Sequence, residues 1–199
     1  FHLIGRVRCV YETGEIMNKK PLLTFIILFA AFFTVGLGQS YAQEPDYDPE
    51  ARLAELGIEL PTPPSPVANY VNGVRTGNLI FLAGKGPKYP DGRELRGKLG
   101  DTVSIKEGYD GARMTAINQM AVLKAMLGDL NKVVRVVKVL GMVNSTPDFV
   151  EQPAVINGFS DLIVEVFGDR GRHARAAVGM ATLPRGQSVE IEMIVEVRE

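Results

Sequence analysis

Hydrophobic positions recur with two different periods along the 199 residues of the chain. After position 104 they are spaced three and four residues apart, as on the apolar face of an α-helix. Ser104 and Glu107 have the spacing of a capping box, and Gly128 follows the last apolar position, where a helix commonly ends. We therefore predict a helix that ends before Gly128 and has an apolar face formed by Tyr109, Ala112, Ala116, Met120, Leu123 and Leu127.

A second helix is predicted within residues 148–168, "DFVEQPAVINGFSDLIVEVFG". Pro153 is suited to its first turn, and Gly168 to the position after its end. Other segments are β-branched or alternate between apolar and polar residues, which is typical of strands. They are a hairpin over 70–84 with its turn at 75–78, a strand over 132–144 that we interpret as buried, and strands over 175–183 and 189–197.

The predicted order of elements is β-β-α-β-α-β-β, an α/β (α+β) arrangement. Two amphipathic helices that both need cover, next to strands rich in valine and isoleucine, favour a sandwich with the helices on one face of the sheet. Residues 85–103 are polar and rich in glycine and proline, which predicts a long loop. Residues 43–69 form a predicted N-terminal arm, with a short helix over Pro49–Leu56 that Gly57 ends and an extended "PTPPSP" segment.

The first 42 residues have the pattern of a targeting segment. Met17 is followed by "NKKP", by the apolar run "LLTFIILFAAFFTVG" and by a small-residue stop at Ser40–Ala42. This pattern predicts a signal peptide over 17–42 and export of the chain, with no stable membrane contact after cleavage. The alternative is an uncleaved membrane anchor, for which the run is short. We interpret residues 1–16 as an upstream extension of the coding sequence, and residues 70–199 as the folded domain.

Composition narrows the possible chemistry. The single cysteine, Cys9, lies before the predicted cleavage point, so we expect no disulfide, thiol nucleophile or thiolate metal site in the mature chain. The chain has 22 Lys and Arg against 23 Asp and Glu, and it has no tryptophan. Because a nucleic-acid-binding domain usually shows a basic face with interleaved aromatic residues, this composition favours a small-molecule partner over a nucleic acid.

A charged pair stands out in the two final strands, which we expect to be partners. Strand residues alternate between faces, so Arg175 shares one face with Ala177, Gly179 and Ala181, which are all small. Glu190 lies near the start of the last strand. One interpretation is that Arg175 is a solvated edge charge or pairs with a local glutamate. The other is that the small residues leave room for a ligand or another subunit beside a buried arginine, which needs a partner.

The stretch "ARAAVGMATLPRGQSVEI", residues 174–191, resembles the signature of the RidA/YjgF family, also called the endoribonuclease L-PSP or chorismate mutase-like group. The resemblance extends over Tyr70–Val197 and includes "YVNGV", "GNLIFLAGKGP" and "DFVEQPAVIN". It implies a chorismate mutase-like (bacillus type) sandwich, a mixed sheet with two helices on one face. It also implies a homotrimer whose clefts between subunits each hold the signature arginine.

The activity that this resemblance implies is the hydrolysis of reactive 2-iminoacids or enamines to 2-oxoacids and ammonia, with no metal or organic cofactor. Arg175 would bind the substrate carboxylate, because a guanidinium offers a carboxylate two parallel hydrogen bonds. Glu190 would position or deprotonate the attacking water. Tyr70, the backbone at Gly84 and Asn157 match other site positions of the family.

Three positions depart from the family pattern. Lys85 replaces the usual glutamine of the binding site, and Ala177 replaces a frequent cysteine. His173 replaces proline or alanine, and we expect an exposed loop histidine, the alternative being one that titrates near the site. These departures and the arm keep a second hypothesis open, a non-catalytic module that binds small carboxylates. RNA cleavage, a third hypothesis, is disfavoured by the charge balance and by the lack of aromatic stripes.

Overall fold

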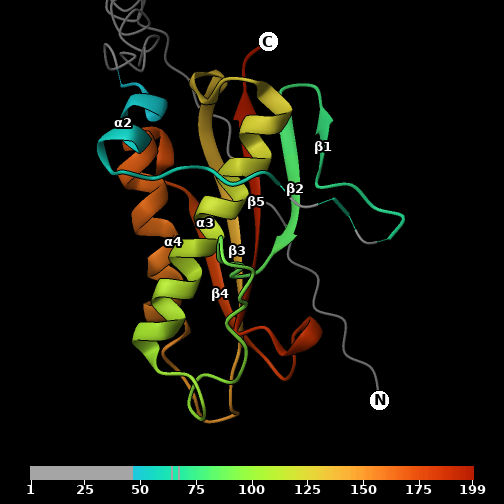
Figure 1. The fold of residues 1–199 in the computed structure, drawn as a ribbon, viewed down its shortest axis with the longest axis vertical. Coiled ribbons are helices and arrows are strands. Elements are labelled where there is room, and N and C mark those ends of the chain that lie inside the picture. Colours follow the sequence, from blue (N-terminus) through green and yellow to red (C-terminus); the bar gives the residue numbers. More distant parts are fainter. Residues whose placement is uncertain (1–46, 64, 67) are drawn as a thin grey trace, which may run out of the picture. The chain divides into compact units, whose positions relative to one another are not determined.

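A five-stranded mixed sheet forms the centre of the computed structural model, which describes residues 47–63, 65–66 and 68–199 (Figure 1). The strands are ordered β1-β2-β5-β3-β4 across the sheet. Within this sheet β3 and β4 are parallel, and the other neighbouring pairs are antiparallel. The strand bounds are β1 Gly73–Thr76, β2 Leu79–Lys85, β3 Val133–Asn144, β4 Ala174–Met180 and β5 Val189–Val197.

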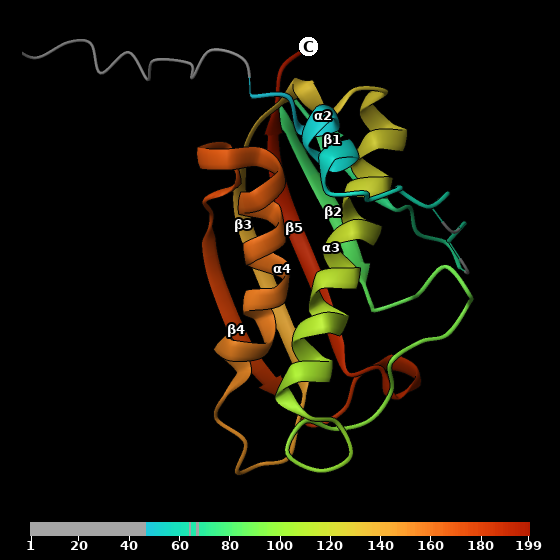
Figure 2. The ribbon, with the colours of Figure 1, turned by 60° about the vertical axis from the view of Figure 1, so that its left-hand side comes forward.

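Two long helices, α3 (Ile105–Leu127) and α4 (Gln152–Phe167), cover one face of this sheet, as Figure 2 shows. Ser104 and Glu107 form the predicted capping box, and Gly128 ends α3 in the left-handed conformation with a φ of 74°. Pro153 lies in the first turn of α4, as its ring requires. The predicted mixed sheet with two helices on one face is therefore confirmed.

The last two strands are not neighbours, and the prediction that they pair was wrong. β3 lies between β4 and β5. Helix α4 carries the chain from the end of β3 back to its start, so that β4 runs parallel to β3 as in a β-α-β unit. Strand β4 also ends at Met180 rather than at residue 183. It is consequently an edge strand, bonded only to β3 within the described sheet.

Strand β3 is buried on one face only, which corrects its interpretation as a buried strand. Val133, Val136 and Val139 face the helices and are almost fully buried, whereas Val134 and Val137 are 40% and 37% exposed. The buried valines are three residues apart, rather than two, because the register of β3 with β5 shifts twice, between Val133 and Arg135 and between Val136 and Lys138. Such bulges place two residues of one strand opposite one residue of the other. The uncovered face of the sheet therefore carries apolar side chains.

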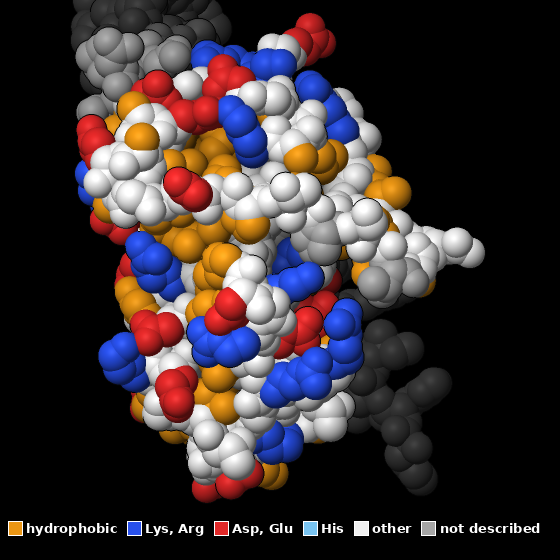
Figure 3. Space-filling model, in the orientation of Figure 1, with side chains coloured by type: hydrophobic (Ala, Val, Ile, Leu, Met, Phe, Trp, Pro, Cys, Tyr) orange, Lys and Arg blue, Asp and Glu red, His pale blue; other side chains and the backbone are white. Residues whose placement is uncertain are grey.

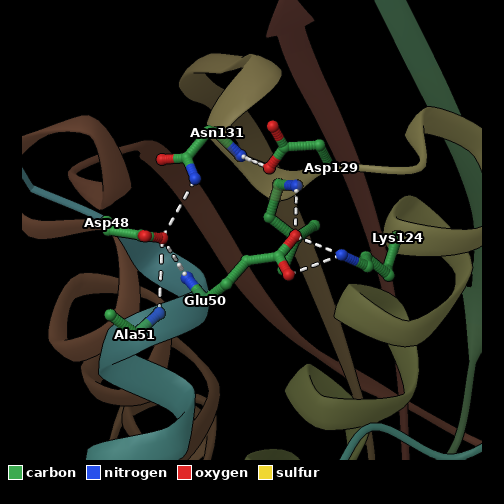
Figure 4. Close-up of polar contacts among 7 residues, drawn as sticks. Asp48, Glu50, Ala51, Lys124, Asp129 and Asn131 are labelled. Atoms are coloured by element: carbon green, nitrogen blue, oxygen red, sulfur yellow. Dashed lines mark hydrogen bonds and ion pairs between the residues drawn. The ribbon is translucent and has the colours of Figure 1, made fainter.

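The N-terminal arm is held on the helices by polar contacts. Helix α2, Pro49–Glu55, begins after Asp48, whose carboxylate accepts hydrogen bonds from the N–H groups of Glu50 and Ala51. The Glu50 carboxylate pairs with the Lys124 ammonium of α3 and accepts the Leu130 N–H at 2.9 Å (Figure 4). The predicted short helix before Gly57 is thus confirmed.

The predicted signal peptide and upstream extension, residues 1–42, lie outside the described residues. Among the described residues, none of the helices has the length and apolar character needed to span a bilayer. Figure 3 shows the face formed by α3 and α4, where acidic and basic side chains are mixed. Hydrophobic side chains gather there beside the arm, where Leu56, Ile58 and Leu60 pack against the core.

Candidate active site

Arg175 lies on the edge strand β4 and points towards α4. In the parallel pairing it is opposite Val139, a fully buried residue of the helix-covered face, so its side chain leaves the sheet on that face. Its Nη1 donates to Asn157 Oδ1 at 2.9 Å and to Ser160 Oγ at 3.1 Å. Asn157 and Ser160 are three residues apart on α4 and therefore lie on the same side of the helix.

Arg175 is consequently an edge-strand charge that hydrogen bonds to α4 hold in place and that no glutamate of the described residues pairs with. Its side chain is half-buried, and within the described residues it forms no ion pair. Both of its hydrogen bonds to the described part of the chain start from Nη1. The Nε–H and Nη2–H groups, which form one edge of the planar guanidinium, donate no hydrogen bond to the described residues. That edge matches the two oxygens of a carboxylate.

His173 lies behind Ser160, and the expectation of an exposed loop histidine was wrong. The ring is half-buried, with Nδ1 2.6 Å from the Gly171 carbonyl oxygen and Nε2 3.0 Å from Ser160 Oγ. Because a carbonyl oxygen only accepts, Nδ1 carries the proton and Nε2 of the neutral ring accepts from the Ser160 hydroxyl. Burial lowers the pKa of His173, the Gly171 hydrogen bond opposes this, and the charge of Arg175 lowers the pKa further.

A second group of predicted residues lies on the uncovered face of the sheet. Glu190 of β5 is opposite Met142 of β3, and its carboxylate lies over the backbone of Gly84. A Cβ at Gly84 would be 2.3 Å from Glu190 Oε1, so any larger residue here would displace the carboxylate. Lys85 follows on the same strand and is half-buried. The structure therefore brings Glu190, Gly84 and Lys85 together.

Burial shifts both ionisable groups of this cluster. It raises the pKa of the Glu190 carboxyl, to which the Glu192 carboxylate adds, while the Lys85 ammonium opposes the rise. It lowers the pKa of Lys85 against the attraction of Glu190. Each shift moves the pKa of its group towards neutral pH, and a general acid or base is most effective when its pKa is near the working pH.

The bulge beside Gly84 is stabilised by a residue that the sequence analysis did not identify. The register of β2 and β5 shifts between Leu82 and Lys85, which interrupts the ladder. Gln119, a fully buried residue of α3, donates its side-chain amide to the Ala83 and Ile191 carbonyl oxygens at 3.0 and 2.7 Å. It thereby replaces the hydrogen bonds that the bulge removes and holds Gly84 against Glu190.

Arg175 and Glu190 do not meet within one chain. Their partners on β3, Val139 and Met142, are three residues apart and point to opposite faces. Arg175 and Glu190 are separated by three residues along the strand direction and by two strand spacings across the sheet, so their Cα atoms are on the order of 14 Å apart. Tyr70, which is half-exposed, precedes β1 at the sheet edge opposite to β4. The predicted residues thus form two groups, Arg175 with Asn157 and Glu190 with Gly84 and Lys85, and Tyr70 lies apart from Arg175.

No cluster of three or more His, Cys, Asp or Glu side chains suited to a metal ion occurs among the described residues. The groups available for chemistry are a guanidinium edge, a carboxylate with a raised pKa and a half-buried ammonium. A guanidinium edge suits a carboxylate, and a carboxyl group with a raised pKa suits a general base, although the two lie apart in one chain.

Comparison with known proteins identifies the family of this fold. Residues 50–196 match the family described as "YjgF/chorismate_mutase-like, putative endoribonuclease". Protein TCP17 of Trypanosoma cruzi is 46% identical over 147 residues, which cover 73% of this chain and 92% of that protein. A protein of Dermatophagoides farinae named 2-iminobutanoate/2-iminopropanoate deaminase is 32% identical over 138 residues, covering 69% of this chain and 93% of that protein.

A solved structure has a similar fold and sequence. The crystal structure of the protein Atu1372 from Agrobacterium tumefaciens, whose function is unknown, is 47% identical in sequence. It superposes with a TM-score of 0.71 and covers 75% of this chain and 92% of that chain.

Proposed function

Because the chain belongs to the YjgF/chorismate mutase-like family, we propose that it hydrolyses reactive 2-iminoacids or their enamines to 2-oxoacids and ammonia. The observation that carries this proposal is the Arg175 guanidinium, which α4 holds through Nη1 while its Nε and Nη2 edge is left for a carboxylate. The name of the Dermatophagoides farinae relative, 2-iminobutanoate/2-iminopropanoate deaminase, supports the same reaction class.

The proposed reaction requires little from the protein beyond positioning. The carboxylate of the iminoacid binds the guanidinium edge of Arg175, and each charge-assisted hydrogen bond contributes about 1.5–3 kcal/mol. Water adds to the electrophilic C=N carbon, its protons pass to nitrogen, and ammonia leaves to give the 2-oxoacid. Glu190, with its raised pKa, is the group that positions this water and takes its proton.

A complete site of this kind needs two copies of the chain. Arg175 and Glu190 leave opposite faces of the sheet, so a single small substrate cannot contact both within one copy. The uncovered face carries exposed apolar side chains, among them Val74, Phe81 and Val178, which favours burial against another subunit. We therefore propose a homotrimer, the assembly implied by the family resemblance, with the site in the cleft between subunits.

The activity is tested by generating iminoacids with an amino-acid oxidase and following their disappearance. We expect the wild-type chain to accelerate hydrolysis and Arg175→Ala to be slower by a factor on the order of 100 or more, since the carboxylate loses both hydrogen bonds. Arg93→Ala is the matched control, because Arg93 is an exposed arginine paired with Asp91. A wild-type rate no faster than that of Arg175→Ala would refute the proposal.

The shared site has its own test, which uses two inactive variants. Arg175→Ala and Glu190→Gln are unfolded together, mixed in equal amounts and refolded. If each site takes Arg175 from one copy and Glu190 from another, random assembly restores about a quarter of the sites. No recovery in mixed oligomers would place both residues in a site formed by one chain.

The alternative function is binding of small 2-oxoacids without turnover. The observation that favours it is the half-buried Lys85 beside Glu190, because an ammonium there opposes the rise in the Glu190 pKa and weakens that group as a base. This alternative predicts calorimetric binding of 2-oxobutanoate with no acceleration of imine hydrolysis. Turnover by the purified protein would exclude it.

A further inference from the structure

Behind the carboxylate-binding arginine lies a continuous chain of hydrogen bonds that no step of the proposed reaction uses. It runs from the Gly171 carbonyl through His173 and Ser160 to Arg175, with distances of 2.6, 3.0 and 3.1 Å. Its members come from the 3-10 turn Gly168–Gly171, the two-residue link that holds His173, helix α4 and the start of strand β4. The Arg175 guanidinium is therefore oriented by groups that are themselves fixed.

Ser160 can hold Arg175 in both protonation states of His173. With the neutral ring, the Ser160 hydroxyl donates to Nε2 and accepts the Nη1–H of Arg175. With the protonated ring, Nε2–H donates to Ser160 instead, and the second lone pair of the hydroxyl oxygen still accepts from Arg175. Nδ1 keeps its proton and its bond to Gly171 in each state.

The other charged groups around His173 are already engaged or point elsewhere. On its own segment, Arg172 pairs with Asp169 at the surface. On α4, Asp161 follows Ser160 and accepts the Tyr109 hydroxyl at 2.9 Å. On β3, the exposed Lys138 is opposite Ala174. Arg175 is the charged side chain that acts on His173 through the shared hydroxyl.

We propose that Ser160 and His173 are positioning residues that hold the Arg175 guanidinium for its ligand, and that protonation of His173 is coupled to carboxylate binding. This inference rests on the proposed carboxylate site at Arg175. The sign of the coupling follows from charge, because a bound carboxylate offsets the positive charge of Arg175 and so favours a protonated His173. By reciprocity, protonation of His173 favours carboxylate binding, and affinity rises as the pH falls through the pKa of this histidine.

The test uses the full chain, 2-oxobutanoate as the probe and calorimetry between pH 5 and pH 7.5. We expect wild-type affinity to rise roughly two- to fivefold as the pH falls from 7.5 to 5. This corresponds to a rise of about half a unit in the pKa of His173 when the ligand binds. His173→Gln keeps an acceptor near the position of Nε2 but does not titrate, so it is expected to bind as the wild type does near pH 7.5 and to lose this part of the pH dependence. Any dependence that His173→Gln retains belongs to other groups, such as Glu190.

Three further variants separate positioning from folding. His173→Leu and Ser160→Ala break the chain, and we expect each to weaken binding at every pH by roughly three- to tenfold, the effect of one lost hydrogen bond. Ser160→Thr keeps the hydroxyl and is expected to restore binding. Thermal unfolding of each variant reports whether the fold is retained, and the NMR titration of the His173 ring, with and without 2-oxobutanoate, measures the coupling directly.

The outcomes separate this inference from the proposed function. If the wild type binds 2-oxobutanoate and Arg175→Ala does not, while Ser160→Ala and His173→Leu bind like the wild type, the inference is overturned and the carboxylate site stands. An NMR pKa of His173 that does not change on binding also overturns it. Binding with the expected pH dependence but no imine turnover overturns the deaminase proposal alone, and no binding by the wild type overturns both.

Discussion

The two faces of the central sheet differ although the same strands build both. Along β5, Val189, Ile191 and Met193 point to the helices and are almost fully buried. The alternate residues Glu190 and Glu192 point to the uncovered face, as strand geometry requires. The first face is a finished hydrophobic core, whereas the second combines charged groups with exposed apolar side chains within one chain.

This difference separates the parts of the molecule that determine the fold from those that complete the site. The covered face is stable by itself because its side chains are buried between sheet and helices. The uncovered face holds Glu190 and Gly84 but lacks the guanidinium, which leaves the sheet on the other side at its edge. The proposed function therefore requires contact between copies, and the following predictions test this difference between the two faces.

The largest effect is expected from a charge on the uncovered face. Val178→Asp places a carboxylate on β4, where the valine is 40% exposed and would be buried in an assembly. We expect dissociation to monomers in sedimentation experiments and a loss of imine hydrolysis by a factor on the order of 100. Val150→Asp is the control, since Val150 is 74% exposed and lies outside the sheet. An active assembly of Val178→Asp would show that this face is not an interface.

The two faces should also respond differently to the same substitution on the same strand. Ile191→Ala removes a fully buried side chain of the covered face and should cost about 2–5 kcal/mol in the free energy of unfolding. Ile194→Ala removes a half-exposed side chain of the other face and should cost about 1 kcal/mol or less in the isolated subunit. Denaturant unfolding below the association concentration measures both, and equal costs would contradict the division.

A smaller effect is expected at the close approach in the Glu190 cluster. In Gly84→Ala the new Cβ would lie 2.3 Å from Glu190 Oε1, so the carboxylate must move. We expect the rate of imine hydrolysis to fall roughly tenfold, about 1.4 kcal/mol, with retained assembly. Gly77→Ala is a useful comparison, because this glycine is in the β1–β2 turn with open space around it, and its positive φ costs stability without affecting Glu190. Unchanged activity of Gly84→Ala would show that the carboxylate position is unimportant.

The smallest effect concerns stability and its dependence on pH. Burial raises the pKa of Glu190 in the folded state, so the folded chain loses stability as the pH rises from the usual carboxyl range through this raised pKa. Glu190→Gln removes this penalty, and we expect it to stabilise the isolated subunit at neutral pH by about 1 kcal/mol or less, since the group is only half-buried. The gain should vanish below the usual carboxyl pKa. Thermal unfolding at several pH values measures it, and a destabilised variant at neutral pH would contradict the sign.

Local signals predicted the helices of this fold well. Ser104 with Glu107, Gly128 and Pro153 act within a few residues of their own position, so the helix ends follow from sequence alone. Strand order depends instead on contacts between distant segments. Nothing near residues 175–197 indicates that β3 lies between the last two strands. Because of its bulges, β3 lacks the regular alternation of a strand buried on one face, and its sequence resembles that of a fully buried strand.

The candidate site was predictable where the family resemblance supplied positions. Arg175 with Asn157 and Glu190 with Gly84 were identified in this way, and the structure brings each pair together. Ser160 could not be identified, because a serine in a helix has no distinctive pattern and its role arises from the neighbouring strand. Gln119 did offer one signal, because it is a polar residue in a buried helix segment. A buried side-chain amide usually forms hydrogen bonds with nearby polar groups, which points to a structural role.

The most direct test of the central claim compares the wild type with Arg175→Lys in the hydrolysis of oxidase-generated iminoacids. Lysine keeps the positive charge but lacks the planar pair of donors that binds a carboxylate side-on. We predict that kcat/KM falls at least tenfold in Arg175→Lys and further in Arg175→Ala. A kcat/KM for Arg175→Ala equal to that of the wild type would contradict a carboxylate site at Arg175.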